Sequence, residues 1–111
     1  MNERMNKVND EIRDKIAEIV EEDVDFEPGV LGTIAGVETS ADLRHAKIWV
    51  GAFPSEKREE VLRILNKNIY EIQGRLNKET KFRRTPRIAF VIDKSAEHVV
   101  KIEKLLREIK E

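Results

Sequence analysis

The sequence contains no cysteine, which excludes disulfides, thiolate metal sites and cysteine nucleophiles. Long apolar runs are missing too: a stretch such as residues 88–92 is far shorter than a membrane crossing. Residues 1–10 are polar and lack the apolar core of a signal peptide. We therefore expect a soluble, cytoplasmic protein. The length of 111 residues predicts one domain, residues 1–111.

Motifs for catalysis and for ligand binding are also scarce. The two histidines, His45 and His98, do not belong to a cluster with metal-ligand spacing. None of the glycines occurs in a phosphate-loop or dinucleotide motif. The acidic stretch at residues 21–27 lacks the ligand spacing of a calcium loop. We expect no enzyme activity, no catalytic residues, no cofactor, no metal site and no small-molecule substrate.

What is present is a regular alternation of amphipathic segments. Apolar residues at steps of three and four predict helices over residues 5–20 and 61–76. Runs rich in Val, Ile and Thr predict a pair of antiparallel strands at residues 30–39 and 44–53, and a third strand at residues 87–92. A final helix is predicted from the stripe Val99, Ile102, Leu105, Leu106 and Ile109. The fold class is therefore α+β, a two-layer single domain with a three-stranded sheet.

The long central helix has two distinct faces. Its apolar stripe consists of Val61, Leu65, Ile69, Ile72 and Leu76. The opposite row consists of Arg63, Lys67, Tyr70, Gly74 and Lys78. Asparagine amides compete for backbone hydrogen bonds, so Asn66 and Asn68 predict a bend, and the continuous stripe favours a shallow one.

Positive charge is concentrated in one part of the chain. Residues 68–87 hold six Lys or Arg against two acids, or +4, although the whole chain has a net charge of −1. Arginine and lysine neutralise backbone phosphates, and an exposed tyrosine can stack on an unpaired base. The candidate RNA-binding residues are Arg44, Arg63, Lys67, Asn68, Tyr70, Gln73, Gly74, Arg75, Lys78, Lys81, Arg83, Arg84 and Arg87.

Two other interpretations are compatible with the same residues. The charged segment could be an ordinary solvated surface, as most charge runs are. Alternatively, the chain could be a small α+β protein–protein interaction domain without RNA binding. In that case Trp49, on the mixed face of the second strand, or the acidic helix surfaces would contact a protein partner.

Two motifs make the sequence similar to a known family. They are VETSADLRHAKIWV at residues 37–50 and KFRRTPRIAFVID at residues 81–93. With the amphipathic first helix and the Glu27–Pro28 turn, they resemble ribosome-binding factor A, a bacterial assembly factor of the small ribosomal subunit.

The resemblance implies a type II KH-like fold and binding to 16S rRNA in the free 30S subunit. It also implies help in late small-subunit maturation and 5′-end processing of that rRNA, notably in the cold, by a monomer without enzyme activity. It carries over Arg44, Arg83 and Arg84 as RNA contacts.

One feature of the family differs in this chain. Where the family has an Ala-x-Gly kink, this chain has Asn68, Ile69 and Tyr70, and Gln73 replaces a common Arg. Either the asparagines make the kink, or the helix runs straighter and Gly74 allows close approach of RNA.

Overall fold

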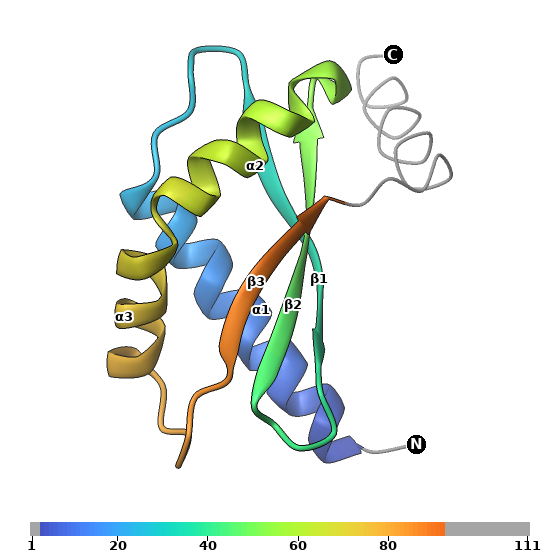
Figure 1. Cartoon of the computed structure of the whole chain (residues 1–111), viewed down its shortest axis with the longest axis vertical. Coiled ribbons are helices and arrows are strands. Elements are labelled where there is room, and N and C mark those ends of the chain that lie inside the picture. Colours follow the sequence, from blue (N-terminus) through green and yellow to red (C-terminus); the bar gives the residue numbers. More distant parts are fainter. Residues whose placement is uncertain (1–2, 93–111) are drawn as a thin grey trace.

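The computed structural model describes residues 3–92 (Figure 1). The elements in chain order are α1 (Glu3–Asp23), β1 (Leu31–Thr39), β2 (His45–Phe53), the short 3-10 helix η1 (Ser55–Lys57), α2 (Arg58–Lys67), α3 (Ile69–Glu79) and β3 (Arg87–Ile92). The predicted α+β class and the predicted order up to β3 are confirmed. The predicted final helix and His98 lie outside the described residues.

The sheet has the strand order β1-β2-β3 and is mixed. The hairpin strands β1 and β2 are antiparallel as predicted, whereas β2 and β3 are parallel. Between Ile34 and Gly36 the β1–β2 register shifts by one residue, which is a β-bulge at Ala35. Within residues 3–92, β1 and β3 are therefore the two edge strands of the sheet.

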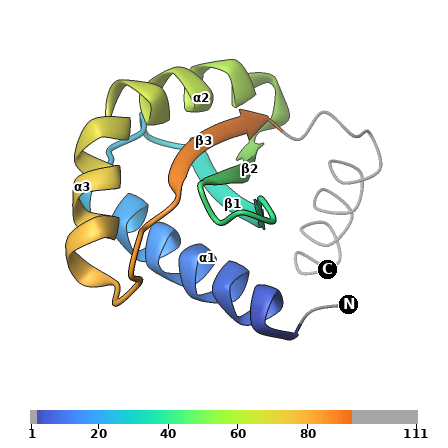
Figure 2. The same cartoon turned by 60° about the horizontal axis from the view of Figure 1, so that its bottom comes forward.

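Helices α1, α2 and α3 lie on one face of the sheet, as Figure 2 shows. The inward side chains of β2 alternate along the strand, so Ala46, Ile48 and Val50 are buried. They pack against Ile12, Ile16 and Ile19 of α1 and against apolar residues of α2 and α3. Burying each such large aliphatic side chain contributes about 1.5 to 3 kcal/mol. The core therefore fixes the helices on the sheet.

The long helix is broken at Asn68, and the chain changes direction strongly between α2 and α3 in both views (Figures 1 and 2). The Asn68 side chain donates Nδ2–H to the Ile64 carbonyl at 2.8 Å. Its backbone N–H is shared between the Ile64 and Leu65 carbonyls, at 3.2 and 3.1 Å. The Asn68 carbonyl then accepts from the Ile72 N–H at 3.0 Å and begins α3. Asparagine thus makes the kink, as one alternative proposed, but the expectation of a shallow bend was wrong.

Candidate nucleic-acid interface

The row predicted on the outer side of the long helix is exposed along its whole length. Arg63 and Lys67 lie on α2, and Gly74 and Lys78 lie on α3. Tyr70 lies two residues after Asn68 and is 86% exposed, the highest value among the exposed large hydrophobic side chains of residues 3–92. A Cβ added at Gly74 would have no atom within 4 Å, so the helix surface there is open. The row therefore presents an aromatic ring beside backbone that another molecule can approach.

The kink also exposes the N-terminal end of α3. The first amides of a helix have no acceptor within that helix, and the helix dipole places partial positive charge there. Phosphate groups bind such ends. Tyr70 is the second residue of α3, so the aromatic ring and these amides are next to one another. The same first turn also carries the exposed acid Glu71, whose charge opposes that of a phosphate.

The loop from α3 to β3 carries three more exposed cations, Lys81, Arg83 and Arg84. Its ends are fixed. The Thr80 hydroxyl donates to the Leu76 carbonyl at 2.6 Å, and Phe82 packs against the core. The cations are thus held at one end of the molecule, the lower end in Figure 1.

The candidate cations differ in whether acids neutralise them. The Asp42 carboxylate lies next to Arg44, whose backbone N–H donates to Asp42 Oδ1 at 3.1 Å. Within residues 3–92, only one of the candidates, Arg75, has its charged group within 4.0 Å of a carboxylate. Those without such a partner are Arg44, Arg63, Lys67, Lys78, Lys81, Arg83, Arg84 and Arg87. Their charge remains available to an anionic ligand.

Arg75 is engaged inside the molecule. Its Nη1 lies 2.9 Å from Glu22 Oε1 and 3.0 Å from Asp23 Oδ2, which joins α3 to the end of α1. Its Nε and Nη2 donate to the two oxygens of Glu79 at 2.6 and 3.0 Å. These hydrogen bonds, that to Glu79 first, raise the pKa of the guanidinium. The hydrogen bond from Arg75 to Glu79 is in turn the main cause that lowers the pKa of Glu79 to about 2. Arg75 therefore connects two helices.

Gln73 also makes its contacts within the protein. Its Nε2 donates to the Pro86 carbonyl at 3.0 Å, and its Oε1 accepts from the Ile88 N–H at 2.8 Å. Both backbone groups belong to the edge of the sheet at the start of β3, where no further strand pairs among the described residues. The side-chain amide therefore takes the place of a neighbouring strand for one residue pair.

The structure brings Arg44 and Arg87 together at the end of the sheet. The Arg87 N–H donates to the Arg44 carbonyl at 2.9 Å, because β3 runs parallel to β2 from this point. His45 is the register partner of Arg87, and both are exposed, as is Lys47. Sequence reasoning missed His45 and Lys47 as neighbours of this basic group. The parallel pairing that places them there has no signal in the local pattern.

Comparison with known proteins identifies the family. The family described as ribosome-binding factor A matches residues 4–106. The chain belongs to the ribosome-binding factor A family. A ribosome-binding factor A of Akkermansia muciniphila is 35% identical over 109 residues, which cover 98% of this chain and 86% of that protein. One of Bdellovibrio bacteriovorus is 41% identical over 83 residues, 74% of this chain and 61% of that protein.

Solved structures of ribosome-binding factor A share the fold. The crystal structure from Thermus thermophilus has a TM-score of 0.67 at 25% identity and covers 79% of this chain and 93% of that one. A solution structure from Thermotoga maritima, of a putative ribosome-binding factor A, has a TM-score of 0.72 at 26% identity and covers 87% and 95%. A homology model of the Thermus thermophilus protein, fitted into a cryo-electron microscopy map of its 30S complex, has a TM-score of 0.65 at 25% identity and covers 78% and 92%.

Within residues 3–92 of this ribosome-binding factor A family member, no group of three or more His, Asp or Glu side chains is arranged to hold a metal ion. Nor is any helix of this part of the chain long and apolar enough to cross a membrane.

Proposed function

We propose that this chain is a ribosome assembly factor that binds 16S rRNA in the free 30S subunit. It assists late small-subunit maturation and 5′-end processing of the rRNA. Two comparisons support the proposal: the chain belongs to the ribosome-binding factor A family, and one structural relative is placed in a 30S complex. In this proposal, residues 1–111 form a single KH-like RNA-binding domain. The protein acts in the cytoplasm as a monomer, by binding and not by catalysis.

One observation carries the assignment of the RNA-binding surface. Tyr70 is almost fully exposed at the first turn of α3, and the cations Lys67 and Lys78 on either side of it along the row have no acid partner within residues 3–92. Proteins bind single-stranded RNA through aromatic rings that stack on the bases and through cations that pair with the backbone phosphates. The Arg83–Arg84 loop extends this surface from the end of α3 to β3.

Sedimentation tests the biological part of the proposal. In a fractionated lysate, we expect the protein to travel with free 30S subunits and not with 70S ribosomes. Absence from the 30S fractions would favour the alternative, a protein–protein interaction domain whose Trp49 face binds a partner.

Salt dependence tests the site. Single-stranded RNA contacts change the slope of log K against log salt by about 0.7 per neutralised phosphate. Replacing Arg83 and Arg84 by Ala should reduce the slope by about 1.4 in binding to 16S rRNA, and adding Lys78→Ala and Lys81→Ala should bring the reduction to about 3. An unchanged slope would place the interface elsewhere.

A matched control removes the same charge outside the candidate surface. Arg4 and Lys7, in the first two turns of α1, are exposed and have no carboxylate within 4.0 Å among residues 3–92. The double change of Arg4 and Lys7 to Ala should leave the salt slope as in the unmodified protein. If both double variants lower the slope equally, the effect follows total charge and not the site.

Substitutions at Tyr70 and Gly74 distinguish an effect on RNA binding from an effect on folding. Because Tyr70 is exposed, Tyr70→Ala should leave the stability unchanged and weaken RNA binding by about 1 to 3 kcal/mol if the ring stacks on a base. Gly74→Ala should stabilise α3 by about 1 kcal/mol, because the site is open and alanine favours helix. A Gly74→Ala protein that is more stable and yet binds RNA less tightly would show that RNA approaches the helix backbone at this position.

A further inference from the structure

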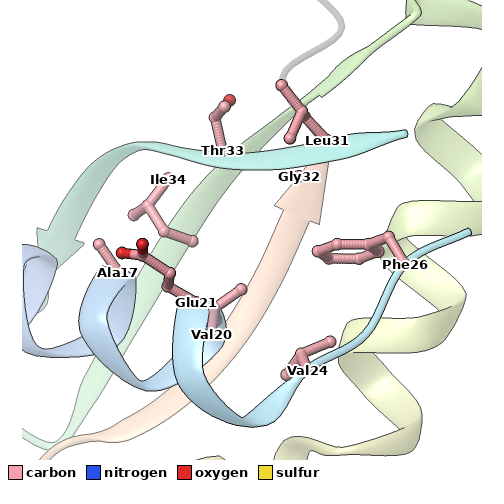
Figure 3. Close-up of a pocket in the computed structure, with 9 residues that line it drawn as sticks. All are labelled: Ala17, Val20, Glu21, Val24, Phe26, Leu31, Gly32, Thr33 and Ile34. Carbon is pink, nitrogen blue, oxygen red and sulfur yellow. The ribbon is translucent and has the colours of Figure 1, made fainter. Parts of the chain in front are cut away.

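A second surface lies on the other side of the molecule, at the β1 edge of the sheet. A groove of about 500 Å³ runs between α1 and β1 (Figure 3). Val20, Val24, Phe26 and Ile34 line it with apolar side chains, and Glu21 of α1 reaches into it. None of the candidate RNA-binding residues lines this groove.

The upper wall of the groove is a strand edge with unused hydrogen-bonding groups. The Thr39 N–H points away from β2, since it donates to Asn9 Oδ1 of α1 at 3.1 Å. Hydrogen-bonded and non-bonded residues alternate along an antiparallel pair. Once the extra residue of the bulge, Ala35, is counted, Val37, Ile34 and Gly32 occupy the same kind of position in the register as Thr39. Their backbone N–H and C=O groups therefore also point away from β2, toward the open edge of β1. Within residues 3–92, no strand pairs with them there.

The lower wall of the groove carries one acid, Glu21, near the end of a helix where cations are favoured. The last turn of α1 has no basic residue and contains Glu21, Glu22 and Asp23, although the helix dipole gives that end partial negative charge. Arg75 compensates Glu22 and Asp23. Glu21, the acid that lines the groove, has no ion-pair partner within residues 3–92, and no cation lines the groove.

We propose that this groove binds an extended segment of a partner protein that carries lysine or arginine and adds to β1 as a further strand. The backbone of the segment would pair with the groups of Gly32, Ile34 and Val37, as in known peptide recognition by strand addition. Its alternate apolar side chains would fill the groove over Val24 and Phe26, and a cation would meet Glu21. Proteins that bind nucleic acid are rich in such cations, because they neutralise phosphate. The inference does not depend on the RNA-binding proposal.

Amide hydrogen exchange on the full-length protein tests strand addition directly. The probe is a nine-residue peptide of alternating valine and lysine, matched in length to β1. On its addition, we expect slower exchange of the Gly32, Ile34 and Val37 amides, and no change for amides near Tyr70. A peptide of alternating valine and glutamate should give no protection, since it would place carboxylates against Glu21.

Charge reversal on α1 tests the acidic wall. Glu21→Lys should weaken binding of the valine–lysine peptide about fivefold, the value expected when one exposed ion pair is lost. Glu11→Lys makes the same change of net charge at an exposed position of α1 that does not line the groove, and it should bind like the unmodified protein.

Three results would overturn the proposal. Protection of the edge amides already in the unliganded protein, at every concentration, would mean that another part of this chain occupies the groove. Protection that grows with protein concentration would mean that a second copy pairs with β1. No protection with the valine–lysine peptide would mean that the edge does not accept a basic strand.

Discussion

Gln73 links α3 to the edge of β3, and replacing it should destabilise the fold without changing how the protein binds RNA. The side chain makes two half-buried hydrogen bonds, to the Pro86 carbonyl and from the Ile88 N–H, at 3.0 and 2.8 Å. Each such bond contributes about 0.5 to 1.5 kcal/mol net. Gln73→Met has a similar length and helix propensity but no polar groups. We therefore expect it to lower the free energy of unfolding by about 1 to 3 kcal/mol.

Urea unfolding followed by the fluorescence of Trp49, the single tryptophan, measures this change. For a domain of this size, the midpoint of thermal unfolding should fall by about 4 to 12 °C. Gln73 also donates to Asn77 Oδ1 at 2.9 Å on the exposed side, so Asn77→Ala provides a control that removes only this surface bond. It should change stability by no more than about 0.5 kcal/mol.

The Gln73 variants distinguish the two roles considered for this residue. Gln73→Glu keeps an acceptor for the Ile88 N–H but places an oxygen against the Pro86 carbonyl, so it should be destabilised at neutral pH and recover in part when protonated. The salt slope of 16S rRNA binding should be unchanged in Gln73→Met. If Gln73→Met keeps full stability and loses RNA affinity, the structural role is refuted and Gln73 is an RNA contact.

Three further changes test other parts of the structure. Gly32→Ala should destabilise the fold by about 1 to 3 kcal/mol in urea unfolding, because the new Cβ would lie 2.7 Å from Phe26 Cζ and overpack the core; an unchanged midpoint would show that Phe26 moves aside. Hydrogen bonding to Arg75 lowers the pKa of Glu79 from its ordinary value of 4.5 to about 2. The ionised Glu79 side chain therefore stabilises the fold fully above pH 4.5, and this contribution is lost as the pH falls from 4.5 towards 2. The stability difference between the unmodified protein and Glu79→Gln should therefore shrink over that range, and a constant difference would contradict the ion pair. Leu43 has a φ of 62°, so Leu43→Gly should raise the free energy of unfolding by about 1 kcal/mol, and a loss of stability would mean that the side chain packs more than its exposure suggests.

Much of the fold followed from local patterns. The antiparallel hairpin was predicted from two runs rich in Val, Ile and Thr, and the strand at residues 87–92 from a compact apolar run. The exposed row with Tyr70 was predicted because the opposite side of the same helix carries the apolar stripe. The bend was predicted from the chemistry of two residues, Asn66 and Asn68, but its strength was not. The angle depends on how α2 and α3 each pack on the sheet.

The sequence predicted which residues could bind RNA, but only the fold showed which of them are engaged inside the protein. Among the charged candidates, Arg75 could not be told from Arg83 or Arg84 by sequence spacing. The acids that engage it, Glu22 and Asp23, lie more than 50 residues earlier in the chain. The same holds for Gln73, whose partners are backbone groups of another element.

By itself, the sequence determined the helices and strands, the buried stripe, the exposed aromatic residue and the family to which the chain belongs. These features follow from contacts between residues a few positions apart and from motifs read in order. Only the tertiary structure decided that β3 runs parallel to β2, that Gln73 and Arg75 are engaged inside the protein, and that β1 borders an apolar groove lined by one acid, Glu21. Each of these depends on residues distant in the chain, whose proximity is set by the packing of the helices on the sheet and leaves no periodic trace in the sequence.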